Sequence, residues 1–346
     1  MSQVLYGERS RNPFARTVEL TGDGLRRGGR TTPLAELNLG AMAEAFLRGQ
    51  WLGGGGTERP LGRLPQDAGT VPVTRVTGTS TPLKVRRAAE FARALGELSV
   101  RVCGGPAAVA ALAERARAED VPLWMARRYA PGPAGPVAVA VDRRLVRVDV
   151  WGPHAPAVRL RAPHGYTGDS SSPGAGLVLT VGDQYARLSL RRTLRKSKRG
   201  VEIQLPGRRW TLRRADATSS WLLRDDARVA LLTRPPRRPD LAPGTVLAPL
   251  PAVRHESPDP LDAVMAHAVA ASFGLGDTTG SARFRARPGD DTDTTWELPW
   301  FSNLGTGHDD NDSGAADGWG SDGGDGGDGG GGDGGDGGGD GGGGGD

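Results

Sequence analysis

The chain has 346 residues, of which 44 are lysine or arginine, 40 are aspartate or glutamate and one is cysteine. The single cysteine, Cys103, excludes an intrachain disulfide and fits a reducing compartment. No apolar run approaches the roughly 18 residues that a membrane-spanning helix needs, and the N-terminus lacks the apolar core of a signal peptide. We therefore expect a cytoplasmic protein with no transmembrane segment.

The charges are unevenly distributed along the chain. Residues 290–346 contain 15 acidic residues and no lysine or arginine. Residues 1–289 therefore carry 44 basic and 25 acidic residues, a net charge of +19, although the whole chain has a formal net charge of only +4. This pattern predicts a basic folded body that carries its own polyanion.

The first part of the chain, residues 1–135, mixes strand and helix patterns. Residues 15–20 and 71–77 are typical of strands, because β-branched residues recur between turn signals. Thr32-Pro33 and Thr81-Pro82 each place a capping residue before a proline, and apolar residues follow both pairs at helical spacing. Both pairs therefore predict helix starts, and the region is expected to be α/β.

A possible small-molecule site lies within this α/β region. Residues 98–103 have a strand pattern, the glycine pair 104–105 forms a turn, 107–119 is alanine-rich, and 121–125 is apolar again. Strand, tight turn, helix and strand make a βαβ unit. If the protein is an enzyme of unrecognised class, residues 98–129 are where we expect its site.

The chain changes character after the turn-rich segment 131–136, which we take as a domain boundary. Short alternating stretches recur every 8–12 residues, as in an antiparallel β-meander. The expected strands are 137–141, 144–151, 157–162, 176–181, 184–190, 200–205, 208–214, 219–224 and 227–234.

A hydrophobic helix follows the meander. Asp259 is a good N-cap, Pro260 fits the first helical position, and Gly274 can end the helix. Apolar residues surround the axis of the expected helix 260–273 on nearly all sides, which is typical of a buried helix. His267 is then expected to be a core histidine and not a metal ligand.

The order of these elements resembles the LURP-one and tubby C-terminal architecture, in which a closed β-barrel wraps a central C-terminal helix. The resemblance covers about residues 137–275 and rests on element order and helix hydrophobicity, with no signature motif. It implies a barrel, and it implies that anionic lipid is one class of partner. No binding residue transfers from that family to this chain.

Together these patterns predict an α+β protein in three parts. Residues 1–135 form the α/β region, and residues 137–275 form an antiparallel β-meander or barrel closed by a buried helix. Residues 276–346 are expected to be a disordered, acidic, Gly/Asp-rich tail, because this composition buries too little apolar area to offset the entropy of ordering. The tail could solubilise the protein, bind calcium, or shield a basic face.

Catalytic motifs are missing from the sequence. There is no phosphate-binding loop, no nucleophile elbow and no zinc-protease helix motif, so we name no catalytic residue, metal ligand or cofactor. Cys103 is expected to be a packed small residue rather than a nucleophile.

The basic segment 184–238 is the best candidate for a binding site. It contains 16 basic and four acidic residues, and the densest run lies between two expected strands. A basic loop beside a cationic sheet face is typical of a polyanion-binding surface. The predicted anion-binding residues are Arg187, Arg191, Arg192, Arg195, Lys196, Lys198, Arg199, Arg209 and Arg213.

Three functions remain open from the sequence. The first is a non-enzymatic binding module whose basic face meets nucleic acid, anionic lipid or an acidic protein, in competition with its own acidic tail. The second is a peripheral membrane module that uses the same basic loop. The third is the enzyme with a site in the N-terminal region.

Overall fold

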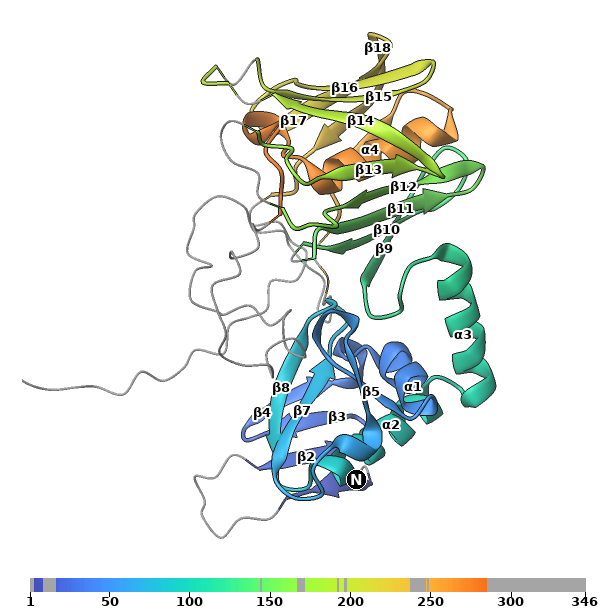
Figure 1. Cartoon of the computed structure of the whole chain (residues 1–346), viewed down its shortest axis with the longest axis vertical. Coiled ribbons are helices and arrows are strands. Elements are labelled where there is room, and N and C mark those ends of the chain that lie inside the picture. The colour runs from blue at the N-terminus through green and yellow to red at the C-terminus, as the bar shows by residue number, and fades with distance from the viewer. Residues whose placement is uncertain are drawn as a thin grey trace, which may run out of the picture.

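The computed structural model describes residues 3–8, 17–143, 145–166, 172–191, 193–195, 198–236, 247 and 249–284. Over these residues the chain is an α+β protein built from helices and antiparallel sheets (Figure 1). The expected α+β class is therefore confirmed. Among the described residues no single helix has the length and apolar character to cross a bilayer; one bent pair of helices, Ala88–Val102 and Pro106–Glu119 at 83°, meets those criteria only when counted together.

The N-terminal part contains small antiparallel sheets and three helices. Its strands are β1 (Val4–Gly7), β2 (Val18–Thr21), β3 (Gly24–Arg27), β4 (Arg30–Pro33), β5 (Gln50–Leu52), β6 (Glu58–Pro60), β7 (Gly69–Thr74) and β8 (Ser80–Val85). Its helices are α1 (Leu39–Leu47), α2 (Ala88–Val102) and α3 (Pro106–Glu119). The strands form one four-stranded sheet, β1 to β4, and two hairpins, β5–β6 and β7–β8. A core of its own includes Trp51, Phe91 and Leu95.

The helix start expected at Thr81-Pro82 is wrong, and the start expected at Thr32-Pro33 gives only a short 3-10 helix, Leu34–Glu36, before α1. Thr81 and Pro82 lie inside β8, where they pair with Val73 and Pro72 of β7. The first pair lies in β4, and α1 begins later, where the Asn38 side chain accepts a hydrogen bond from the Ala41 backbone N–H. Proline at the edge of a two-stranded hairpin costs no ladder bond, so it does not have to mark a helix.

The expected βαβ unit is also wrong. Residues 98–102 are the last turns of α2, and 121–125 contain no strand. Leu95, Leu98 and Ser99 are buried at the i, i+3, i+4 spacing of a helix, and Ser99 Oγ donates to the Leu95 carbonyl at 2.7 Å. The alternating β-branched residues at the end of this helix imitated a strand.

The larger part is a single sheet of eleven antiparallel strands in which every strand pairs with its neighbours in sequence. The strands are β9 (Ala126–Ala130), β10 (Val137–Asp142), β11 (Arg147–Gly152), β12 (Ala155–Arg161), β13 (Val178–Val181), β14 (Gln184–Arg191), β15 (Gly200–Leu205), β16 (Arg208–Arg214), β17 (Ser219–Arg224), β18 (Ala227–Thr233) and β19 (Ala252–His255). All nine strands of the predicted meander are confirmed as β10 to β18. The two edge strands, β9 and β19, were not predicted; β9 joins this sheet from the N-terminal side of the expected boundary at 131–136.

Helix α4 (Pro260–Ser272) is the helix predicted after the meander. The Asp259 side chain accepts from the Leu261 backbone N–H at 2.9 Å, as its N-cap position predicts. Nearly every side chain of α4 is buried, and the helix packs on β10, β11, β12 and β18 (Figure 1). The inner sheet residues and α4 form the largest hydrophobic core of the protein.

The closed barrel implied by the LURP-one and tubby resemblance is wrong. The sheet is open, and within the described residues no ladder joins β9 to β19. Strand β14 pairs with β13 through residues 184–186 and with β15 through 187–191, so the sheet turns at this strand. It turns around α4 without closing. Burial of the helix followed from its composition, but closure depends on how the edge strands pair, and no sequence pattern encoded that.

Residues 276–284 belong to the segment expected as a tail, and the structure describes them. The backbone N–H of Gly276 donates to Ser220 Oγ at 2.9 Å, Thr279 is buried, and Phe284 packs edge-on against Tyr166. The remaining residues of the expected tail, 285–346, lie outside the described residues.

A small third cluster joins the two parts. Ala41 and Leu52 of the N-terminal part pack with Trp124, Met125 and Ala140 near the start of the large sheet. Polar contacts extend this junction at the buried carboxylate of Asp149, which pairs with Arg147, Arg159 and Arg161. Arg159 Nη2 also donates to the Glu119 carbonyl at 3.1 Å, at the C-terminus of α3, where a cation is favourable.

The buried histidine of α4 predicts acid sensitivity. Burial, and secondarily the nearby His255, lower the pKa of His267 to about 4. The unfolded chain has a histidine pKa of about 6.5 and therefore takes up a proton at a pH where the native state does not. Between pH 7 and pH 5 this group should lower the free energy of unfolding by about 2 kcal/mol.

Urea unfolding at the two pH values tests this expectation. The variant His267→Leu should lose that component of the pH dependence, whereas His164→Leu, at an exposed histidine, should keep it. An unchanged pH dependence in His267→Leu would contradict the assignment.

Candidate anion-binding face

Alternation along the strands separates a buried face from a charged one. On β15, Val201, Ile203 and Leu205 point into the core, so Glu202 and Gln204 point outward. The same alternation on β14 and β16 buries Trp210 and Leu212 and leaves arginines outside. We call the outward surface of β14 to β19 the basic face.

Four of the predicted anion-binding residues lie together on this face. Arg187 and Arg209 both stand opposite Gln204 of the central strand, and Arg191 and Arg213 both stand opposite Gly200. The four arginines therefore form two rows across β14, β15 and β16. Within each row the two backbones lie about 10 Å apart, twice the spacing of neighbouring strands. All four side chains are exposed.

Acidic neighbours only partly balance these charges. Arg209 and Arg213 share one carboxylate, that of Asp226, at 3.2 Å and 3.4 Å. None of the ion pairs between described residues involves Arg187 or Arg191. Exposed pairs of this kind contribute little to stability and exchange readily with other partners. The basic face therefore keeps positive charge for a ligand.

The connection between β14 and β15 holds the other predicted residues. Arg195 and Lys198 are exposed, whereas Arg199 is half-buried and its Nε donates to the Thr193 carbonyl at 2.8 Å. Arg199 therefore braces the loop. Arg192 and Lys196 lie outside the described residues.

The structure adds cations that sequence reasoning missed. Trp221 of β17 stands opposite Arg213, and the guanidinium carbons of Arg228 and Arg254 lie 4.5 Å and 5.7 Å from its ring centroids. Such cation–π contacts orient the arginines and leave their charge in place. Strand alternation in the predicted stretch 227–234 could have identified Arg228, but Arg254 lies in the unpredicted edge strand β19.

A network of buried and half-buried polar groups fixes the sheet to α4 behind the basic face. Trp210 Nε1 donates to Asp262 Oδ1 at 2.9 Å, and Arg224 Nη1 donates to Asp262 Oδ2 at 2.7 Å and to Asp259 at 2.8 Å. Arg208 also donates to Asp259, at 2.8 Å. Burial alone would raise the pKa of Asp259, but the Leu261 N–H and the two arginines lower it overall.

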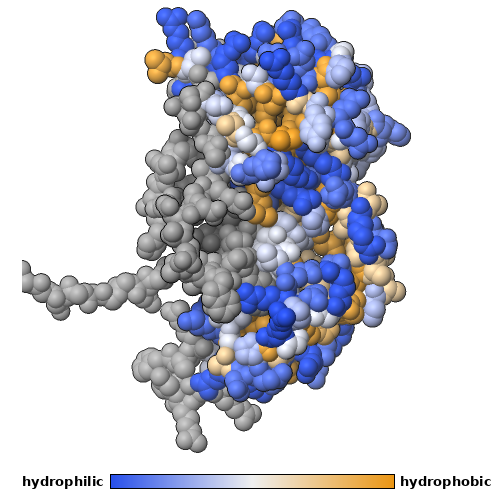
Figure 2. Space-filling model, viewed as in Figure 1, coloured by the Kyte–Doolittle hydropathy of each residue, from blue (hydrophilic) through white to orange (hydrophobic). Residues whose placement is uncertain are grey.

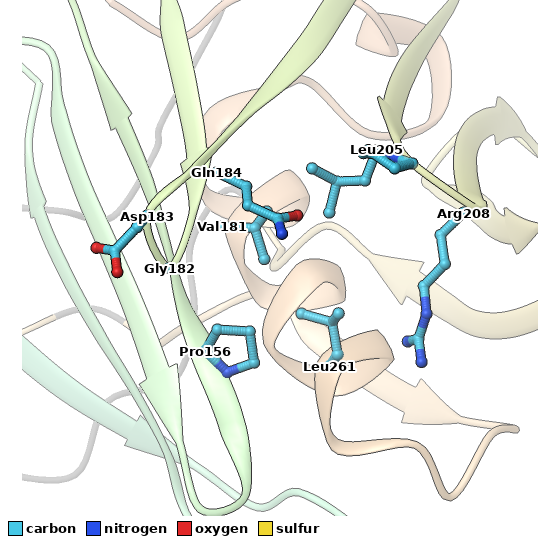
Figure 3. Close-up of a pocket in the computed structure, with 9 residues that line it drawn as sticks. Pro156, Val181, Gly182, Asp183, Gln184, Leu205, Arg208 and Leu261 are labelled. Carbon is cyan, nitrogen blue, oxygen red and sulfur yellow. The ribbon is translucent and has the colours of Figure 1, made fainter.

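A cavity of about 480 Å³ lies beside this network (Figure 3). The side chains of Gln184, Leu205 and Leu261 point toward it, and Asp183 points away (Figure 3). Arg208 is at its border but is already bonded to Asp259. With Asp183 pointing away and Arg208 bonded to Asp259, the cavity presents mainly uncharged side chains to a ligand.

Chemically reactive groups are few in the described part of the chain. Burial raises the pKa of the Cys103 thiol, which favours the unreactive protonated form. No group of three histidine, cysteine or acidic residues in the described ranges could hold a metal ion.

Comparison with protein-family models, curated proteins and solved structures finds no match to this chain. The comparisons therefore give no support to the LURP-one and tubby resemblance, which the open sheet already contradicts.

The Asp262 network predicts a large loss of stability on a small change. In Asp262→Asn an amide replaces a carboxylate that accepts from Trp210, Arg224 and Ser257. One of the two acceptor oxygens becomes an N–H donor that faces other donors, and Arg224 retains only Asp259 as an anionic partner. We expect the free energy of unfolding to fall by about 3 kcal/mol.

Urea unfolding followed by circular dichroism measures this change. Asp183→Asn makes the same substitution at an exposed site and should alter stability by less than about 0.5 kcal/mol. Equal stability of the two variants would show that the buried carboxylate does not hold α4 in place.

Proposed function

We propose that the protein is a non-enzymatic binding module whose basic face receives an anionic partner. The observation that carries this proposal is the outward alignment of Arg187, Arg191, Arg209 and Arg213 over three strands. Among the residues that the structure describes, one carboxylate is shared by these arginines. Guanidinium groups suit phosphate and carboxylate, because their planar donors bind two oxygens at once.

The sheet prepares these side chains for binding. Their backbones are fixed by the ladders of β14, β15 and β16, and the core beneath includes the buried Trp210 and Leu212. A rigid support lowers the entropy lost on binding. Affinity should fall steeply with salt, because each neutralised phosphate releases counterions.

The acidic C-terminal segment is proposed as a competitor for the same face. Residues 290–346 carry 15 acidic side chains and no basic ones. Coil scaling gives a segment of this length an expected reach of about 40 Å, and a tether of that reach gives a millimolar effective concentration. At that concentration even weak contacts would compete with an external ligand.

The alternatives differ in what supports them. The enzymatic alternative rested on a βαβ unit at 98–125, and two consecutive helices occupy most of that region. The membrane alternative has a specific observation in its favour, the fully exposed Leu194 in the loop between β14 and β15.

Removing the acidic segment tests the competition. A variant that ends at residue 289 should bind double-stranded DNA, RNA or anionic vesicles more tightly than the full chain at low salt, and the difference should shrink as salt rises. Fluorescence anisotropy and vesicle co-sedimentation measure these affinities. Equal affinity of the two proteins at low salt would refute the competition but not the basic face.

Neutralising one arginine of each row, both on β14, tests the binding surface itself. Arg187→Gln with Arg191→Gln should weaken binding to every polyanion and, with DNA, lower the slope of log affinity against log salt by roughly two. The matched control is Arg93→Gln with Arg115→Gln, which removes the same charge from exposed positions on α2 and α3. If both double variants behave alike, binding reflects net charge and not this face.

A further inference from the structure

The tip of the loop between β14 and β15 exposes an aliphatic side chain completely. Leu194 is 100% exposed, which no other large hydrophobic residue of the described chain matches. Tyr185, at the opposite end of β14, is the next most exposed at 78%. A single exposed leucine is ordinary, so its surroundings decide whether it has a role.

Cations surround this leucine. Arg191 ends β14 just before the tip, and Arg213 of β16 belongs to the same row of the basic face. Arg195 and Lys198 follow the tip and are exposed. We call these four cations the basic collar of Leu194. No acidic residue occurs between positions 184 and 201, and the acidic contact of the collar within the described chain is that of Arg213 with Asp226.

Hydrogen bonds within the loop hold its shape. Thr193 Oγ1 donates to the Arg195 carbonyl at 2.8 Å, and the Lys198 backbone N–H donates to the same carbonyl at 3.0 Å. Arg199 then bonds the Thr193 carbonyl at 2.8 Å. These bonds link described residues on both sides of Leu194, whose side chain is fully exposed.

The loop also lies where a flat surface could reach it. Strands β14 to β18 occupy the end of the molecule remote from β1 to β8 (Figure 1). Hydrophilic side chains cover much of the rim at that end (Figure 2). The N-terminal part therefore does not stand between this loop and a planar partner.

We propose that the partner of the basic face is an anionic membrane surface, and that Leu194 inserts between the lipids while Arg191, Arg195, Lys198 and Arg213 contact the headgroups. This inference rests on the proposed function. An aliphatic side chain within a basic collar strengthens binding to an anionic bilayer, because burial of the apolar group and attraction to the headgroups both favour the bound state. The same cations would also bind nucleic acid, but an aliphatic side chain adds little affinity there, because bases stack on aromatic side chains.

The test compares variants of the full chain on phosphatidylcholine vesicles with and without phosphatidylserine. Leu194→Ser should weaken binding to the anionic vesicles roughly ten-fold, because the apolar side chain no longer leaves water. Arg195→Gln with Lys198→Gln should weaken it about five-fold for each charge removed. Tyr129→Ser, the matched control, removes a 65% exposed aromatic group on β9, outside the basic face, and should leave binding unchanged.

A fluorescent probe reports insertion directly. In a Cys103→Ser background, Leu194→Cys carrying an environment-sensitive dye should shift its emission to the blue on anionic vesicles. The same dye on Tyr129→Cys, at an exposed position of β9, should not. Binding to double-stranded DNA is measured in parallel and tests nucleic acid as the alternative class of partner. The Leu194→Ser variant should bind DNA as tightly as the unaltered chain.

The outcomes separate the two proposals. If Leu194→Ser binds vesicles like the unaltered chain and the dye does not shift, insertion is refuted while the basic face stands. If DNA binds and vesicles do not, the membrane is refuted and the partner is a nucleic acid. If neither polyanion binds even after removal of residues 290–346, the proposed function itself fails.

Discussion

The carboxylate of Asp262 is the contact on which the large sheet depends. It lies at the first turn of α4, is almost fully buried, and accepts from an indole, a guanidinium and a hydroxyl that come from β16, β17 and the segment before the helix. Apolar packing alone has no direction, and nearly every face of α4 is apolar. This polar network therefore fixes the rotation and depth of the helix within the sheet, as buried polar groups do when every one of them is satisfied.

The basic face follows from that arrangement. Once α4 fixes which side of the sheet is inside, the period of two assigns each strand residue to the core or to solvent. Trp210 must enter the core to reach Asp262, so Arg209 and Arg213 must point outward. A shift of β16 by one residue would bury two arginines and expose a tryptophan. The positions of the cations are thus set by the same contacts that stabilise the sheet.

Sequence patterns predicted the part of the fold in which neighbouring residues decide the structure. Alternation located β10 to β18, and the cap at Asp259 located the start of α4, because both signals are local. Local sequence patterns gave wrong predictions where the structure of a segment depends on contacts with residues distant in sequence. The Thr81-Pro82 pair has a good helix-start signal, but its partner strand β7 makes it a strand. At the C-terminal end of α2 apolar and polar residues alternate as in a strand, but the segment is helical because a helix buries Leu95 and Leu98 on one side. The predicted cations Arg187, Arg191, Arg209 and Arg213 share one face. Arg199 instead bonds within its loop, and Arg254 was missed because its edge strand is too short to recognise from the sequence.

The uninterrupted order of the large sheet has a consequence for synthesis of the chain. Each of its strands pairs with the strand made just before it, so hairpins can form one after another as the polypeptide leaves the ribosome. Helix α4, however, is made after β19, and until then the valines and leucines of the inner face have no helix to cover them. The nascent protein therefore passes through a stage with a large apolar sheet surface open to other chains, and a pause in translation between residues 233 and 260 would prolong exposure to aggregation and to chaperones.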